Sequence, residues 1–117
     1  MTFPHRGEVY LVRFDPAEGS EIKKTRPALI VQNDIGNRYS ATTIVAAITT
    51  KSDDKHYPTE VPIPAPEGGL DQDSIVRLDH IRSLDKKRLI RRLGKLKPKS
   101  IEAVDRAVRI SLGLVEL

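Results

Sequence analysis

The chain has 117 residues, a net charge of +4 and no cysteine. Its length suits one hydrophobic core, so we expect a single domain over residues 1–117. With 38% apolar and 31% charged residues, the composition is that of a folded protein. The missing cysteine excludes disulfides, thiolate zinc sites and a cysteine nucleophile. No apolar run approaches the roughly 20 residues of a membrane-spanning helix, and we expect a cytoplasmic protein without membrane contact.

Short segments rich in β-branched and apolar residues predict strands along most of the chain. A loop of about a dozen residues, rich in charges and prolines, follows the first of them, and loops of that length in compact domains are usually functional or disordered. The segment DIGNRYS (34–40) has turn chemistry. The predicted strands cover residues 7–14, 28–33, 41–50, 59–64 and 74–81.

Two helices are predicted after the strands. Ser83 or Asp85 caps the first, a short helix over KKRLIRRL (86–93). Pro98 begins the second, which carries one apolar stripe at helical spacing that we expect to pack on a sheet. The stripe consists of Ile101, Val104, Val108, Leu112 and Val115, with Ala107 and Ser111 beside it. The fold class is therefore α+β and mostly β: a small antiparallel β-barrel or strongly bent sheet with one main helix.

Basic residues are clustered rather than spread evenly. Residues 86–100 carry eight lysines and arginines and no acidic residue, and a second group comprises Lys23, Lys24 and Arg26. Such clusters attract phosphate backbones, anionic lipids or acidic proteins, although many are simply solvated surface. With only two Phe, three Tyr and no Trp, a surface built mainly on base stacking is not expected.

Several familiar kinds of site are not indicated. His5, His56 and His80 are far apart in sequence and share no ligand spacing, so we predict no metal site. Gly68-Gly69 precedes a predicted strand rather than a helix, which does not match a phosphate-binding loop. No serine lies in a G-x-S-x-G elbow, the motif that presents a serine nucleophile. We also predict no cofactor.

A different set of polar residues lies at the ends of predicted strands, where a rigid sheet holds side chains that face solvent. An arginine, hydroxyls, a carboxylate and an imidazole can cleave RNA without a metal, by promoting attack of a 2′-OH on its neighbouring phosphorus. The alternative is that Arg77 and Asp79 form a surface ion pair, and that the threonines merely favour strands. The set comprises Arg26, Thr49, Thr50, Arg77, Asp79 and His80.

At these residues the sequence resembles the MazF/PemK/Kid family of toxin endoribonucleases from bacterial toxin–antitoxin pairs. The resemblance covers nearly the whole chain, and the combination of motifs is more specific than any one motif. It implies an SH3-like barrel with a long C-terminal helix, and a homodimer that cuts single-stranded RNA to leave 2′,3′-cyclic phosphate and 5′-OH ends. The matching motifs are RGEVYLVRFDPAEGSE (6–21), TRPALIVQND (25–34), TTIVAAITT (42–50), DSIVRLDHIRSLDKKRL (73–89) and SLGL (111–114).

The resemblance implies a central catalytic pair, Arg26 and Thr49. Some members add an Arg-x-Asp pair that falls here on Arg77 and Asp79, and one branch has a histidine where this chain has Ser20. An arginine stays protonated at neutral pH, so Arg26 is expected to stabilise the phosphorane charge rather than carry protons.

Thr49 is then expected to donate to a phosphate oxygen, Asp79 to act as base and His80 as acid. The residues expected to bind RNA are Ser20, Glu21, Lys23, Lys24, Asn33, Thr50 and Lys51.

The resemblance also implies a cognate antitoxin with an acidic, partly disordered tail, which can compete with RNA for a basic groove. Two other functions remain open at this point. A gyrase-poisoning toxin of the CcdB type shares the barrel but uses a C-terminal tryptophan that this chain lacks. A non-catalytic RNA-binding module would keep salt-dependent binding without cleavage.

Overall fold

The computed structural model describes residues 2–14, 25–53 and 57–116. Its strands form one six-stranded antiparallel sheet in the order β4-β5-β3-β2-β1-β6. The strands are β1 (Glu8–Arg13), β2 (Thr25–Ile30), β3 (Thr42–Thr50), β4 (Glu60–Ile63), β5 (Ser74–Asp85) and β6 (Leu89–Lys95). The helices are α1 (Asp34–Tyr39) and α2 (Pro98–Ser111), with 3₁₀ turns η1 (Glu67–Gly69) and η2 (Lys86–Arg88).

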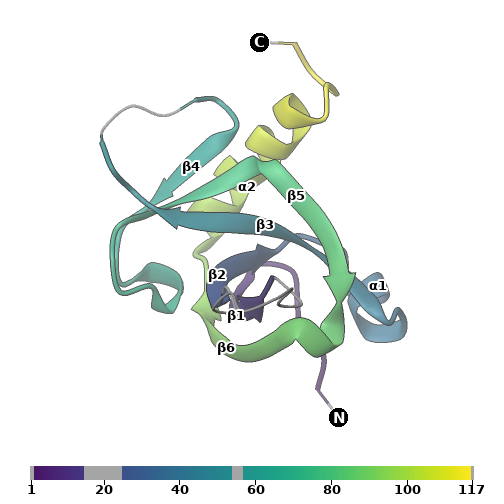
Figure 1. Cartoon of the computed structure of the whole chain (residues 1–117). Helices are drawn as coiled ribbons and strands as arrows, with labels where there is room; N and C mark the ends of the chain where they lie inside the picture. Colours follow the sequence, from purple (N-terminus) through teal and green to yellow (C-terminus); the bar gives the residue numbers. More distant parts are fainter. Residues whose placement is uncertain (1, 15–24, 54–56, 117) are drawn as a thin grey trace, which may run out of the picture.

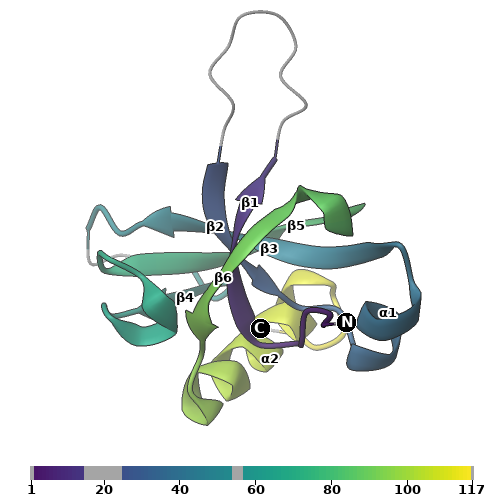
Figure 2. The ribbon, with the colours of Figure 1, turned by 90° about the horizontal axis from the view of Figure 1, so that it is seen from below.

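The expected mostly β fold with a C-terminal helix is confirmed, and the sheet is strongly curved (Figures 1 and 2). Within the described residues the edge strands β4 and β6 do not pair with each other, so the sheet is not closed into a complete barrel. A bulge in β5 contributes to its shape, because Ala46 pairs with Ile81 while the next residue, Ala47, pairs with Arg77. No helix in the described part of the chain is long and apolar enough to cross a membrane.

The two faces of the sheet are buried to different extents. The main core lies on the face covered by α2, which packs against β4 and β5 through the buried side chains of Val104 and Ala107. A smaller apolar cluster lies on the other face, around Val12, Ala28 and Val45. Because that cluster is small, the same face has room for polar side chains at the ends of its strands.

The prediction of a short helix over residues 86–93 is wrong. Only Lys86–Arg88 are helical, as a 3₁₀ turn that Asp85 caps by accepting from the Lys87 N–H, and residues 89–95 form β6. β6 pairs with β1, whose backbone groups on that side would otherwise be an exposed sheet edge. Tertiary pairing therefore outweighs the helix-forming side chains.

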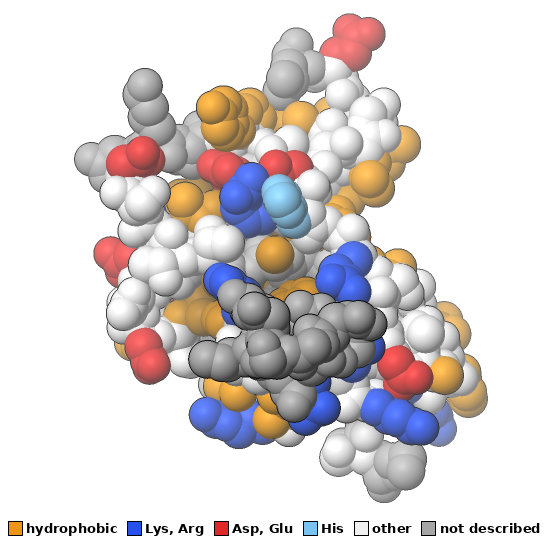
Figure 3. All heavy atoms as spheres, in the orientation of Figure 1, with side chains coloured by type: hydrophobic (Ala, Val, Ile, Leu, Met, Phe, Trp, Pro, Cys, Tyr) orange, Lys and Arg blue, Asp and Glu red, His pale blue; other side chains and the backbone are white. Residues whose placement is uncertain are grey.

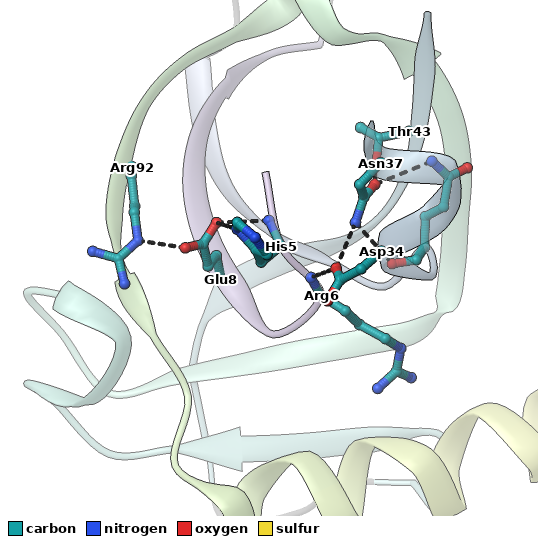
Figure 4. Close-up of polar contacts among 8 residues, drawn as sticks. His5, Arg6, Glu8, Asp34, Asn37, Thr43 and Arg92 are labelled. Carbon is teal, nitrogen blue, oxygen red and sulfur yellow. Dashed lines mark hydrogen bonds and ion pairs between the residues drawn. The ribbon is translucent and has the colours of Figure 1, made fainter. Parts of the chain in front are cut away.

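Residues 34–39, expected as a turn, form α1 instead. Asn33 caps this helix by accepting from the Gly36 N–H, and Asn37, which is part of the helix, is fully buried. The Asn37 Oδ1 accepts from the Thr43 hydroxyl at 2.7 Å, and its Nδ2 donates to Asp34 (Figure 4). These bonds satisfy a buried polar side chain and fix the passage from β2 to β3.

The apolar stripe of the last helix is only partly confirmed. Val104 and Ala107 are buried, whereas Leu112 and Val115 are exposed. The helix ends at Ser111, and Gly113 follows with a positive φ of 75°, which favours glycine and stops the helix. Beyond that point the helical spacing no longer points the apolar side chains toward the sheet.

Candidate active site

Arg26 and Thr49 lie on the same face of the sheet, the face of the smaller apolar cluster. In the ladder between β2 and β3, Ala28 pairs with Ala47. Arg26 lies two residues before Ala28 and Thr49 two residues after Ala47, so strand alternation puts all four side chains on one face. Arg26 is the second residue of β2 and Thr49 the last but one of the antiparallel strand β3, so both lie at the same end of the sheet.

The two side chains differ in accessibility. Arg26 is exposed and Thr49 is half-buried. Within the described part of the chain, the Arg26 guanidinium makes no hydrogen bond or ion pair. A guanidinium and a hydroxyl at the same end of a sheet can receive the charged oxygens of a phosphodiester.

Arg77 belongs to this face as well, because it pairs with Ala47 across β3 and β5. Its guanidinium is held by two carboxylates: Nε lies 3.4 Å from Glu60, and Nη2 donates to Asp79 at 3.1 Å. The Glu60 side chain is only 10% exposed and also accepts from the Tyr57 N–H. Glu60 and Asp79 together fix the direction of Arg77.

The ion pair changes the proton affinities of its members. The hydrogen bond from Arg77 lowers the pKa of Asp79 below its ordinary value, and the same bond is the main reason that the pKa of Arg77 is raised. Asp79 is therefore ionised at neutral pH but is a weaker base than an isolated carboxylate.

His80 is in contact with the same pair. Its Nε2 lies 3.2 Å from the Arg77 Nη2, and because arginine only donates, a hydrogen bond here requires Nε2 to accept. In the neutral imidazole the proton then lies on Nδ1. Figure 3 shows a histidine beside a basic side chain and acidic side chains, with further basic side chains lower on the same face.

The structure places the remaining predicted residues differently. Thr50 is exposed and points to the opposite face from Thr49, and the Lys51 N–H donates to the Asp73 carbonyl. Asn33 lies beyond the other end of β2 from Arg26, and its side chain caps α1. The predicted RNA contacts Ser20, Glu21, Lys23 and Lys24 lie outside the described residues.

Glu60 was not predicted from the sequence as part of the site. The alternation of TEVPIP (59–64) was its only signal, since it places Glu60 and Pro62 on one side of an edge strand. That this side faces Arg77 depends on the register of β4 against β5, in which Glu60 pairs with Arg77.

The sequence and the fold both match a family of toxins. Residues 5–112 match the family described as the PemK-like, MazF-like toxin of type II toxin–antitoxin systems. The chain therefore belongs to this family.

A named relative and two solved structures are similar to the chain. Endoribonuclease EndoA of Bacillus subtilis (strain 168) is 44% identical over 111 residues, which cover 95% of this chain and 96% of the relative. An endoribonuclease in complex with its cognate antitoxin from Mycobacterial species is 28% identical, with a TM-score of 0.80 and coverage of 97% and 99%. A MazE–MazF structure (Form-II) from Deinococcus radiodurans is 27% identical, with a TM-score of 0.81 and coverage of 98% and 100%.

Proposed function

We propose that this chain is a metal-independent endoribonuclease toxin that cuts single-stranded RNA at short sequence motifs and so inhibits translation and growth. Endoribonuclease activity accords with its family and with its similarity to EndoA. The observation that carries the mechanism is the position of Arg26 and Thr49 on one accessible face at the same end of adjacent strands. This placement allows both side chains to contact one phosphodiester.

The reaction is an internal transfer at phosphorus. The 2′-oxygen attacks the adjacent phosphorus, the bond to the 5′-oxygen breaks, and the products are a 2′,3′-cyclic phosphate and a 5′-OH. Arg26 stabilises the negative charge that develops on the equatorial oxygens, and the Thr49 hydroxyl donates to one of them. One proton must leave the 2′-OH and one must reach the 5′-oxygen.

Proton transfer is assigned to the Asp79 and His80 side chains, and their roles differ from those expected from the sequence. Asp79 was expected as the base, but the bond from Arg77 lowers its pKa and so weakens its basicity. An imidazole can both accept and donate protons near neutral pH. His80 is therefore the stronger candidate for transferring the protons, and Asp79 is the stronger candidate for orienting the His80 ring.

We further propose that the chain works as a cytoplasmic homodimer with an acidic antitoxin as its partner. Solved relatives include an endoribonuclease bound to its cognate antitoxin and a MazE–MazF structure. A net charge of +4 favours binding of both RNA and an acidic peptide, and so favours competition between them.

The first test uses a defined RNA in buffer with EDTA. Wild-type protein is expected to cut it, Arg26→Ala to cut about 10²–10³-fold more slowly, and Thr49→Val to be slowed in the same direction. A 2′-deoxy substitution at the cleaved nucleotide is expected to abolish cutting while binding persists. The measurements are single-turnover rates and analysis of the RNA ends.

The same experiment distinguishes the two alternatives. A non-catalytic RNA-binding module would give an unchanged product pattern with Arg26→Ala. A gyrase poison would leave RNA intact and stabilise gyrase cleavage complexes instead. Cutting at a 2′-deoxy nucleotide would rule out the internal transfer.

A further inference from the structure

A pocket of about 430 Å³ lies behind the candidate active site, on the opposite face of the sheet. Thr50 and Pro27 line it, and they are the chain neighbours of Thr49 and Arg26. Consecutive strand residues point to opposite faces, so the pocket is separated from the active site only by the ends of β2 and β3. Nothing in the proposed reaction uses this pocket.

The lining of the pocket combines apolar walls with groups that can donate or accept hydrogen bonds. Leu11, Leu70 and Leu93 supply apolar surface, and the rim carries Asp71, Gln72 and Arg91. The Asp71 and Arg91 side chains are exposed and have no hydrogen bond or ion pair within the described residues. A carboxylate and a guanidinium without partners can bind a ligand that offers both an acceptor edge and a donor edge.

Close backbone packing holds one wall of the pocket in place. Gly69 has a φ of 74°, and a Cβ added there would lie 2.0 Å from the Leu93 carbonyl oxygen of β6. A Cβ on Gly94 would lie 2.6 Å from the Gly68 carbonyl carbon. The η1 turn therefore rests directly on β6 at a spacing that only glycine permits.

The loop that follows η1 is also fixed. Its Asp73 carboxylate accepts from the Ala65 N–H at 2.9 Å, its Asp73 carbonyl accepts from the Lys51 N–H, and the Ser74 hydroxyl donates to the Gln72 carbonyl. These bonds occupy the backbone of the loop and leave the Asp71 side chain at the pocket. The pocket is thus formed before any ligand binds, which reduces the cost of ordering on binding.

We propose that this pocket binds one unstacked RNA base next to the cleaved bond, and that it selects guanine. The inference rests on the proposed function. Proteins read single-stranded RNA by binding splayed bases through their edges. The guanine O6 and N7 can accept from Arg91, as in the commonest specific arginine contact, and its N1–H and N2 amino group can donate to Asp71.

The test maps cut sites on a random RNA library with the full-length protein. Asp71→Asn keeps the shape of the side chain but removes the charged acceptor, and Arg91→Ala removes the donors. Both variants are expected to reduce the preference for guanine at one shared position flanking the cut by about tenfold or more. Lys95→Ala is the matched control, because Lys95 is an exposed cation of β6 outside the pocket lining. It is expected to leave all base preferences unchanged.

A binding measurement makes the result independent of cleavage. RNA oligonucleotides with a 2′-deoxy nucleotide at the cut site and a varied flanking base are titrated by fluorescence anisotropy. Wild-type protein is expected to bind the guanine oligonucleotide most tightly, and Asp71→Asn to lose most of that difference.

Unchanged base preferences in both variants, with cutting retained, would overturn the pocket assignment and leave the proposed nuclease function intact. Weaker binding of an acidic antitoxin peptide with an unchanged cutting pattern would identify a peptide pocket and also overturn it. Conversely, failure of Arg26→Ala to slow cutting would contradict the proposed mechanism, while the base preferences could still be read.

Discussion

Arg77 shows how single residues organise this site. The two carboxylates that hold it come from different strands, Glu60 from β4 and Asp79 from the bulge of β5. The bulge in β5 allows Asp79 and His80 to fold back on Arg77, which a regular strand would not do for two consecutive side chains. The proton-carrying candidates are therefore held by local geometry as well as by charge.

The Asp79 pKa leads to a prediction about pH. Since the bond from Arg77 lowers that pKa, the native state binds fewer protons than the unfolded state near the ordinary aspartate value. The ion pair therefore contributes fully above about pH 4, and its contribution disappears as the pH falls through the lower native pKa. Urea unfolding of wild type and Asp79→Asn is expected to differ by less than about 1 kcal/mol at pH 7, because the pair is exposed.

The difference in free energy of unfolding between wild type and Asp79→Asn is expected to shrink below about pH 4.

The ionisation of Asp79 also bears on catalysis. Because Asp79 stays ionised between pH 5 and 8, its own protonation produces no change in rate over that range. Asp79→Asn is therefore expected to leave the shape of the pH–rate profile unchanged in that range. A profile that changes shape there in Asp79→Asn would instead assign proton transfer to the carboxylate.

At the scale of elements, α2 stabilises the sheet over part of its length only. Val104 is 1% exposed in the main core, whereas Leu112, on the same stripe in sequence, is 60% exposed. The difference arises because the helix ends at Ser111 and the chain turns at Gly113.

The two positions form a matched pair of substitutions. Val104→Ala is expected to lower the free energy of unfolding by about 1–3 kcal/mol, since buried apolar surface is lost and a cavity remains. Leu112→Ala is expected to change it by less than about 0.5 kcal/mol. Chemical denaturation of each protein at several concentrations also shows whether Leu112 is buried in a dimer. A concentration-dependent loss of stability in Leu112→Ala would place it there.

At the scale of the whole molecule, the net charge of +4 is expected to favour RNA binding. Arg26 is the second residue of β2, and Lys23 and Lys24, which lie outside the described residues, precede it closely in the sequence. Lys99 is the second residue of α2, which follows the end of β6 that pairs with Glu8. We therefore expect the cations that precede or begin β2 to contact RNA phosphates, and Lys99 not to contact them.

This arrangement predicts how binding depends on salt. Each of Lys23→Ala and Lys24→Ala is expected to flatten the slope of log affinity against log salt by about 0.7 for single-stranded RNA. Lys99→Ala is expected to leave the slope unchanged. The measurement is a salt titration with uncleavable 2′-deoxy RNA. Equal slopes in wild type and in the three variants would exclude Lys23 and Lys24 from the binding surface.

Much of the fold followed from the sequence because its signals are local. Runs of β-branched residues marked five of the six strands, and Pro98 marked the start of the last helix. The strand at residues 89–95 was missed because it depends on pairing with β1, which is far away in the chain. The helix at 34–39 was missed although its support is local: Asn33 caps it, and the Asn37 side chain within it accepts from Thr43, six residues further on.

For the site, the sequence alone determined the chemical groups available and the positions of Arg26 and Thr49 near strand ends. Arg77 was expected at the end of a strand over residues 74–81, but β5 continues to Asp85, so Arg77 lies in the interior of the strand. Only the tertiary structure decided that these side chains share a face, that Glu60 and Asp79 clamp Arg77, and that Thr50 points into a pocket behind them. The physical reason is strand register, which sets the face of each side chain with a period of two and depends on pairing between residues far apart in the chain.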